Sequence, residues 1–292
     1  MIIFLILLLI LVIYYLSYFI YSNRNILNIN RLLKDRQIVP IASKPALLDK
    51  PLNEFYINTS HNSYLSFLQH LSFVKSQNIK NVLEFGARVI ELDISHMNNI
   101  PIVAHGTKNF ITTSYIYLEK ALDTILQYGF NTSDPLIIFC EIYNPENQIV
   151  IQNIKQIFLN KFKDKLLLPN TTDIGNNIAN KPIKFFLNKV ILLGPLDNFN
   201  ILQDLIFPDY NYINYSDDDD RLSQLYNGLE LTRVYKASGI FSYLSFNFDF
   251  LSLWKNNYKL VTMNFQMKDS ILYNYLKFFK NTSFIHQSEI DI

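Results

Sequence analysis

Short apolar runs alternate with longer amphipathic stretches along most of the chain, and this rhythm constrains the fold more than any other feature. Helical stretches fit between the early runs, at about 72–85, 115–129 and 147–164, which is the βαβα order of a parallel sheet. With eight candidate strands, the pattern predicts an α/β fold of the (β/α)8 barrel type. The candidate strands are Phe55–Thr59, Arg88–Ile94, Ile100–Ala104, Leu136–Cys140, Lys189–Leu193, Leu231–Tyr235, Leu260–Phe265 and Ser283–His286.

Length and composition are those of a single large folded domain. The 292 residues accommodate one barrel, which typically needs about 250 residues, and a short appendage. With 49% hydrophobic and 17% charged residues, the chain has enough apolar surface for a core and is not disordered. The net charge of +1 argues against nucleic acid as a partner. The single cysteine, Cys140, excludes an intramolecular disulfide and mildly favours a cytosolic domain.

The first 22 residues form a candidate membrane anchor. From Ile2 to Tyr21 the chain is apolar or aromatic except for Ser17, and a helix of about 20 such residues spans a bilayer. The alternative, a cleaved signal peptide, requires a basic start, a shorter apolar core and a small-residue cleavage site, all of which are missing. Arg24, Arg31, Lys34 and Arg36 follow the run. The positive-inside rule therefore predicts a single-pass membrane protein whose C-terminal domain is cytosolic.

The remaining boundaries follow from composition. Residues 23–50 combine a basic start with two prolines and read as a spacer between membrane and domain. Residues 51–292 form the domain, in two parts, 51–195 and 231–288. The region 196–230 between them contains the acidic run Asp217–Asp220 and reads as a solvated linker.

Three carboxylates occupy the predicted strand ends. Side chains alternate along a strand, so Val89, Glu91 and Asp93 share one face, and Glu141 ends another apolar run. A buried carboxylate must meet a cation, accept hydrogen bonds or stay protonated. Salt bridges to Arg88 or a lysine would explain any one of these acids, but three together favour a shared metal. Carboxylates with the amide of Asn62 suit a hard cation, calcium or magnesium, better than zinc.

Two histidines end strands at the same edge. His61 ends the first candidate strand and His105 the third, and the active sites of α/β barrels lie at the carboxyl ends of the strands. A lone histidine is more often structural, but two of them beside three acids indicate acid–base chemistry on a phosphoryl group. The other histidines lack this placement and were expected to be surface or core residues. They are His70, His96 and His286.

At these residues the chain resembles the eukaryotic phosphoinositide-specific phospholipases C, over both halves of their catalytic barrel. The first half, from Pro51 to Leu168, contains Phe-Tyr-Ile-Asn-Thr-Ser-His-Asn-Ser-Tyr-Leu, Gly-Ala-Arg-Val-Ile-Glu-Leu-Asp, Pro-Ile-Val-Ala-His-Gly and Phe-Cys-Glu-Ile-Tyr. The second half, from Leu231 to Gln287, matches more weakly through Thr-Arg-Val-Tyr, Ser-Phe-Asn-Phe and Met-Asn-Phe-Gln.

The resemblance implies a set of residue roles. It makes His61 and His105 the catalytic histidines, and it makes the calcium ligands Asn62, Glu91, Asp93 and Glu141. Arg233 and Tyr235 match the phosphate-binding arginine and the ring-stacking tyrosine of the family. The implied activity is calcium-dependent cleavage of phosphatidylinositol or its phosphorylated forms into diacylglycerol and inositol phosphate, through a cyclic inositol phosphate.

The chain departs from the family at one position that concerns the substrate. Members selective for polyphosphorylated headgroups carry Lys-Gly-Lys at the end of the fifth strand, where this chain has Leu193-Gly194-Pro195. Headgroup preference is therefore open. The alternative function is a catalytically weak or inactive phosphoinositide-binding protein tethered to a membrane. Apolar residues near the predicted catalytic loops, such as Phe67, Leu68 and Phe110, are candidates for contact with the membrane interface.

Overall fold

The computed structural model of the chain describes residues 9, 12–13, 27–67, 69–107, 110–169, 177–195, 202–208, 211–215, 231–236 and 246–291. Nearly all of the predicted membrane span, Ile2–Tyr21, and the acidic run Asp217–Asp220 lie outside these residues. None of the helices in the described part combines the length and the apolar character needed to cross a bilayer.

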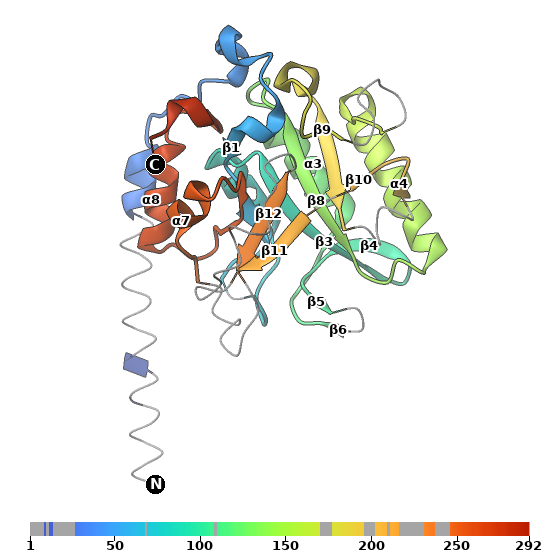
Figure 1. The fold of residues 1–292 in the computed structure, drawn as a ribbon. Helices are drawn as coiled ribbons and strands as arrows, with labels where there is room; N and C mark the ends of the chain where they lie inside the picture. The colour runs from blue at the N-terminus through green and yellow to red at the C-terminus, as the bar shows by residue number, and fades with distance from the viewer. Residues whose placement is uncertain are drawn as a thin grey trace.

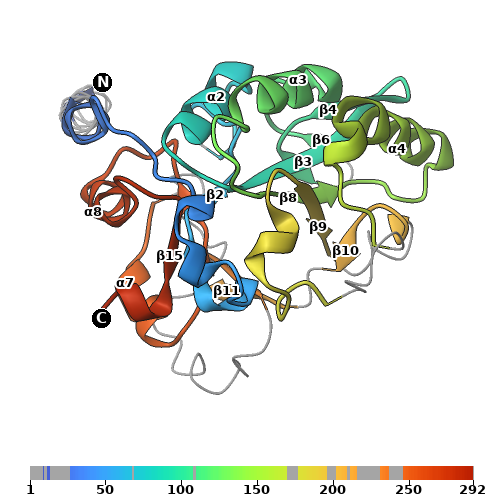
Figure 2. The same ribbon diagram turned by 90° about the horizontal axis from the view of Figure 1, so that it is seen from above.

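Most strands pair in parallel, within a six-stranded sheet, a three-stranded sheet and a two-stranded sheet (Figures 1 and 2). Parallel pairs link β11 to β12, β12 to β13, β14 to β2, β3 to β8, β8 to β9 and β9 to β10. A parallel bridge between Thr59 and Val89 joins the β2 segment to β3. The predicted α/β class is confirmed. The strands are β2 (Ser60–His61), β3 (Val89–Met97), β8 (Leu136–Ile142), β9 (Val190–Gly194), β10 (Phe207–Pro208), β11 (Asn211–Tyr215), β12 (Thr232–Lys236), β13 (Leu260–Val261) and β14 (Met263–Asn264).

Two of the eight predicted strands are antiparallel, which corrects the expected series of eight parallel strands. β4 (Ile100–Val103) pairs antiparallel with β3 and with β7 (Ile116–Tyr117). Only Asn98 and Asn99 separate β3 from β4, and both have positive φ, whereas a parallel crossover needs a dozen residues or more. The last strand, β15 (Phe284–His286), pairs antiparallel with β1 (Phe55–Ile57).

The region predicted as a solvated linker, 196–230, contributes to the sheet. β10 continues the sheet beyond β9, and β11 lies beside β12 in a five-residue parallel register. No candidate strand was assigned to residues 207–208 or 211–215 from the sequence, whereas the structure has β10 and β11 there. These runs are short and rich in Tyr, Asn and Pro, so they lack the apolar signal of the other strands.

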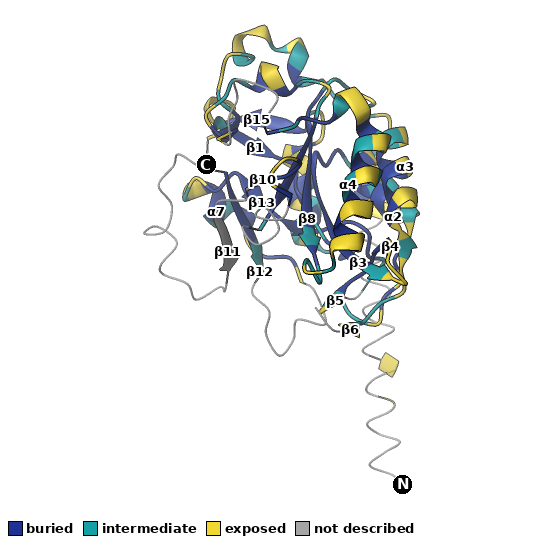
Figure 3. Cartoon of the chain, turned by 90° about the vertical axis from the view of Figure 1, so that its right-hand side faces the viewer, coloured by how far each residue is buried: buried dark blue, intermediate teal, exposed yellow. Residues whose placement is uncertain are grey.

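Helices cover the outer face of the sheet. Figure 2 shows two groups of helices outside the strands, with α2, α3 and α4 along one part of the periphery and α7 and α8 along another, and Figure 3 shows exposed residues on the outer helix faces. Side-chain caps begin three of them: Asn147 accepts from the Val150 amide, Asp269 from Leu272 and Asp249 from Leu251. The helices are α2 (Ser76–Glu84), α3 (Leu118–Tyr128), α4 (Gln148–Phe162), α7 (Phe250–Lys255) and α8 (Ser270–Phe278).

The period of two along each strand divides the apolar residues between two cores. On β3, Ile90 and Leu92 face outward into the large core beneath the helices, whereas Val89 faces a smaller interior core. Ile137 and Phe139 of β8 join Val89 there. Glu91, Asp93 and Glu141 occupy the next positions of this same inward parity, which directs their carboxylates to the inner face.

Residues 27–50 differ from the expected free spacer. Residues 27–33 are helical, and Ile29 is fully buried in the large core. Further along, Ile41 is fully buried in the interior core. This segment therefore packs as part of the domain.

Candidate active site

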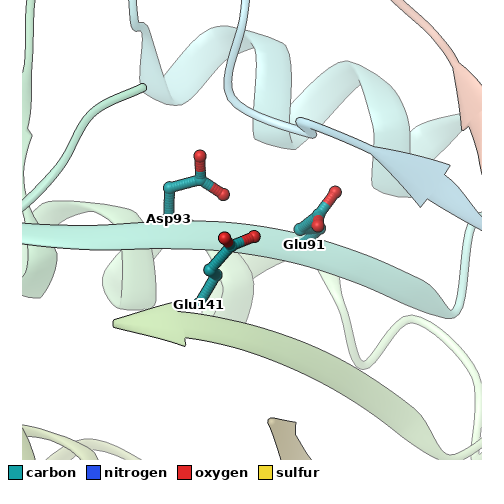
Figure 4. A group of neighbouring side chains, drawn as sticks. All are labelled: Glu91, Asp93 and Glu141. Carbon is teal, nitrogen blue, oxygen red and sulfur yellow. The ribbon is translucent and has the colours of Figure 1, made fainter. Parts of the chain in front are cut away.

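The three carboxylates meet on the inner face of the sheet. Asp93 of β3 lies opposite Glu141 of β8 in the parallel register, and Glu91 lies two residues before Asp93. One oxygen from each lies within 4.8 Å of the others, and Figure 4 shows the carboxylate groups turned toward one another. Such a group of oxygen donors matches the coordination preference of a hard divalent cation.

The electrostatics of this cluster favour an added positive charge. Burial, together with the neighbouring charges of Asp93 and Glu91, raises the pKa of Glu141 to about 8. Burial also disfavours ionised Asp93, but hydrogen bonds and charge from His105 and a hydrogen bond from Tyr143 outweigh it and lower the pKa. The buried Oδ1 of Asp93 accepts no hydrogen bond from the described residues. The residues thus fit a calcium ion.

Asn62 is held in a strained position beside the cluster. Its φ of 47° lies in the left-handed region, which costs free energy for a residue with a side chain. The backbone N–H of Asn62 donates to Glu91 Oε2 at 3.0 Å, and the Tyr64 hydroxyl donates to Asn62 Oδ1 at 3.0 Å. These bonds fix the position of Asn62 beside Glu91.

The β3–β4 hairpin brings His105 to Asp93. Because β4 returns antiparallel along β3, the Ala104 amide donates to the Asp93 carbonyl at 3.1 Å. The Nδ1–H of His105 donates to Asp93 Oδ2 at 2.8 Å, and Tyr143 donates to the same oxygen at 2.8 Å. Burial lowers the pKa of His105, but the bond and the charge of Asp93 outweigh it, so the net shift is upward. His105 therefore holds a proton more readily than a free histidine does.

His61 is fixed by the second half of the chain. Its Nδ1 lies 2.8 Å from Asn264 Oδ1 on β14, an oxygen that also accepts from Gln266 at 3.2 Å. An acceptor at this distance places the proton on Nδ1, so Nε2 faces the carboxylates, 3.5 Å from Glu91 Oε2. The Tyr235 ring stacks on His61 with centroids 5.9 Å apart.

Arg233 of β12 connects the two halves of the chain. Its Nη1 lies 2.5 Å from Glu91 Oε1, and both side chains are almost completely buried. The guanidinium also lies over the rings of Phe139, at 4.5 Å, and Tyr235, at 5.1 Å. The structure therefore brings all eight predicted site residues into one connected group at the end of the sheet where the parallel strands finish. We call this end the mouth.

The X-domain model of the phosphatidylinositol-specific phospholipase C family matches residues 48–194, half of the chain. This stretch includes every site residue except Arg233 and Tyr235. The chain belongs to the phosphatidylinositol-specific phospholipase C family. The resemblance identified in the sequence is thereby confirmed.

Curated phospholipase C relatives match part of the chain. The Saccharomyces cerevisiae 1-phosphatidylinositol 4,5-bisphosphate phosphodiesterase 1 is 38% identical over 120 residues, which cover 40% of this chain and 13% of that protein. The human protein named inactive phospholipase C-like protein 1 is 29% identical over 127 residues, 42% of this chain and 11% of that protein. The matching part is thus a small fraction of these relatives' length.

Solved phospholipase C structures share the fold. The crystal structure of L. pealei PLC21 superposes with a TM-score of 0.65 at 18% identity and covers 82% of this chain and 37% of that one. A calcium-dependent phosphoinositol-specific phospholipase C from a Pseudomonas species gives a TM-score of 0.53 at 12% identity, covering 77% of this chain and 94% of that one. At such identities the similarity concerns the fold alone, and it agrees with the α/β class.

Sequence reasoning missed several residues that complete this phospholipase C site. Asn264 lies in the Met-Asn-Phe-Gln motif, which was noted without a role for the asparagine. Tyr64 and Tyr143 closely follow Asn62 and Glu141, but a tyrosine beside a charged residue is too common to signal a hydrogen bond. His70 was expected to be a surface or core residue, yet its ring lies 5.1 Å from that of His105 and its Nδ1 lies 2.8 Å from Thr112 Oγ1.

Proposed function

We propose that the chain is a calcium-dependent phosphodiesterase. It cleaves phosphatidylinositol or its phosphorylated forms into diacylglycerol and an inositol phosphate, through a cyclic inositol phosphate. The observation that carries this proposal is the single cluster of eight residues, in which a histidine–aspartate pair adjoins a group of three carboxylates.

Calcium would be held by oxygen atoms of Asn62, Glu91, Asp93 and Glu141, and when bound it stabilises negative charge on the reacting oxygens. Asp93 has a buried oxygen left for this purpose, since its other oxygen accepts from His105 and Tyr143. Arg233 already neutralises part of the charge of Glu91.

The two histidines then have different tasks. A carboxylate of the cluster takes the proton of the inositol 2-hydroxyl, and this oxygen forms a bond to the 1-phosphate as the bond to the diacylglycerol oxygen breaks. His105, with Nδ1 bonded to Asp93, presents Nε2–H and donates this proton to the departing oxygen. His61, whose Nδ1–H is bonded to Asn264, would stabilise the phosphoryl oxygens by donating from Nε2–H when both of its ring nitrogens carry protons. Water then opens the cyclic phosphodiester with the proton transfers reversed.

Arg233 and Tyr235 form the side of the site that would bind the headgroup. A guanidinium binds phosphate through charge-assisted hydrogen bonds, and the Tyr235 ring next to His61 offers a flat apolar surface for the inositol ring. Leu193, at the end of β9, is buried in the interior core and offers no charge to a phosphate.

We also propose that the protein is held at a membrane by residues 2–21 with the α/β domain on the cytosolic side. Three strongly exposed apolar side chains beside the site support contact with lipid. We call this group the rim; it consists of Leu71 (85% exposed), Phe73 (64%) and Phe110 (69%). Of the candidates named from the sequence, Phe110 belongs to it, and Leu68 lies outside the described residues.

A direct assay tests the activity. The full chain in detergent–lipid mixed micelles is given phosphatidylinositol, its monophosphate or its bisphosphate, with calcium or with excess chelator. We expect water-soluble inositol phosphate to appear only with calcium, and His105→Ala to abolish its release. Full activity in chelator would refute the metal assignment.

The same assay separates the enzyme from its alternative, an inactive phosphoinositide-binding protein. This alternative has specific support, because one relative is named an inactive phospholipase C-like protein. Lipid binding without turnover in calcium would favour it. Against it, both histidines and all four proposed calcium ligands are present and mutually arranged.

A further inference from the structure

The first described helix is fixed to the domain. Residues 27–33 carry apolar side chains at helical spacing, with Ile29 fully buried and Leu32 and Leu33 packed against the same core. Figures 1 and 2 show this helix beside α8.

Polar contacts hold the residues that follow. The Arg36 guanidinium donates to the Glu84 carbonyl at the end of α2. Gly86, with φ of 85°, leaves room for it, because a Cβ there would lie 3.3 Å from Arg36 Nη2. The Val39 amide donates to the Asn281 carbonyl at 2.8 Å, and the Ile41 amide donates to Asp134 Oδ1 at 2.7 Å. We call residues 27–41 the docked segment.

The helix of the docked segment runs between the end of the sheet where strands begin and the mouth side of the molecule. Arg36 contacts the loop that leads into β3, which belongs to the end of the sheet where strands begin. A helix rises about 1.5 Å per residue, so the first residue of helix 27–33 is displaced from this point by roughly the length of the helix. Figure 1 shows the helix of residues 27–33 extending toward the end of the molecule where β5 (Gly106–Thr107) and β6 (Phe110–Ile111) lie, which is the mouth.

The rim lies at the same end of the molecule. The Leu71 amide donates to the Thr112 carbonyl at 3.0 Å, which joins the loops that carry Leu71 and Phe110. The Thr112 amide in turn donates to the His105 carbonyl at 2.9 Å. Leu71 has a φ of 54°, and this backbone conformation costs free energy for a residue with a side chain. This cost accompanies the placement of an exposed apolar side chain beside the site.

We infer that the docked segment fixes the orientation of the domain on its own membrane, so that the mouth and the rim face the bilayer in which residues 2–21 are held. This rests on the proposed function and its membrane anchor. Only five residues, 22–26, separate the apolar run from the docked helix, and they reach at most about 20 Å when extended. The proposed anchor and the mouth therefore lie on the same side of the domain, and the short connection prevents the domain from rotating so that the mouth faces away from the membrane.

The test measures orientation without turnover. The full chain is reconstituted in calcium-free vesicles of phosphatidylcholine that contain a brominated, fluorescence-quenching lipid. A polarity-sensitive dye is attached at Thr107→Cys on the mouth side or at Ala46→Cys on the opposite side; both native residues are exposed, and buried Cys140 is protected from the label. The substitutions Leu71→Ser, Phe73→Ser and Phe110→Ser remove the insertion of the rim into the bilayer. Any remaining orientation of the domain then comes from residues 22–26 and the docked segment.

In this background we expect the dye at residue 107 to be quenched at least about threefold more than that at residue 46, since a domain of this size is about 40 Å across. A flexible Gly/Ser insertion of about 20 residues between Ile26 and Leu27 should make the quenching of the dyes at residues 107 and 46 equal. The same insertion before Ile2 should leave the difference in quenching unchanged. Equal quenching with the native junction, an unchanged difference after the insertion, or failure of the chain to float with the vesicles would overturn the inference. Hydrolysis of a short-chain, soluble phosphatidylinositol by the same preparations tests the proposed activity separately.

Discussion

At the scale of single residues, the two histidines are held differently, and this should separate their roles. His105 is bonded through Nδ1 to a carboxylate, whereas His61 is bonded through Nδ1 to a neutral amide. Only the first arrangement favours the protonated ring that a general acid requires.

We therefore expect His105→Ala to be partly rescued by substrates with a good leaving group, which needs little protonation, and His61→Ala not to be rescued. General acid catalysis is typically worth about 10²- to 10⁴-fold, and the rescue should recover much of this factor. The measurement compares kcat/KM for natural and activated substrates. Equal rescue of both variants would contradict the division of roles.

Glu141 should make calcium binding depend on pH. In the metal-free protein its pKa is about 8, raised from 4.5, so between these values the folded state holds a proton that the unfolded state has lost. The stability of the metal-free protein should therefore fall as pH rises from 4.5 to 8. A bound cation favours the ionised carboxylate, so calcium binding should release this proton and tighten as pH rises through the same window.

Calorimetric titration with calcium in buffers of different ionisation enthalpy measures the released proton. Glu141→Gln cannot ionise and should abolish the release, while Glu146→Gln, a nearby acid outside the carboxylate cluster, serves as the control. Binding that is equally tight at both ends of the window would contradict the assignment of Glu141 as a ligand.

Most of the site could be predicted from single residues, because they occupy short motifs in which the alternation of side chains along a strand shows which ones point inward. The inward direction of Glu91 and Asp93 follows from their alternation with Ile90 and Leu92. Asn264 could not be assigned a role, since its partner, His61, lies 203 residues away in the chain. No local pattern reports such a contact.

At the scale of elements, the end of β9 should determine headgroup preference. Leu193 is buried in the interior core, where family members selective for polyphosphorylated lipids carry a lysine. Each charge-assisted contact is worth about 1.5–3 kcal/mol, so losing two should relax selectivity. We expect phosphatidylinositol or its monophosphate to be cleaved about as fast as the bisphosphate in the mixed-micelle assay. A hundredfold preference for the bisphosphate would show that other basic residues contact these phosphates.

The docked segment makes a second prediction at this scale, on stability. Ile29→Ala empties a fully buried position and should lower the free energy of unfolding by about 2–5 kcal/mol. Asn30→Ala, on the exposed side of the same helix, should change it little. Denaturant unfolding followed by tryptophan fluorescence measures both, because Trp254 is buried. Equally small changes in the free energy of unfolding for the two variants would indicate that residues 27–41 are a free spacer.

The elements also show where sequence patterns are insufficient. Apolar runs in the sequence locate β3, β4, β8 and β9, but such runs do not indicate strand direction, so the antiparallel pairing of β4 and β15 does not follow from them. The Asn98-Asn99 turn is the sequence feature that indicates the antiparallel direction of β4. The docked helix could not be recognised from the sequence, because its apolar positions, 29, 32 and 33, are interspersed with basic residues that resemble a membrane flank.

At the scale of the whole molecule, anchoring and chemistry should be separable. Deleting residues 1–22 removes the proposed anchor and leaves the docked segment intact. We expect the truncated protein to leave the membrane fraction while hydrolysing detergent-dispersed substrate at close to the full rate. Deleting residues 1–41 should instead destabilise the domain, because Ile29, Arg36 and Ile41 are lost from their contacts. Membrane retention of the shorter deletion would show that other residues anchor the chain.

The two-residue parity of β3 and β8 also limits how such a protein can evolve. One residue inserted between Val89 and Glu91 would turn both acids toward the helices and bring Ile90 or Leu92 inward, exchanging site and core in a single event. Selection should therefore eliminate insertions and deletions in β3 and β8, whereas such changes should accumulate in the loops between the strands. New substrate preferences would then arise by substitution at inward positions, such as Leu193, or by loop growth around an unchanged set of acids.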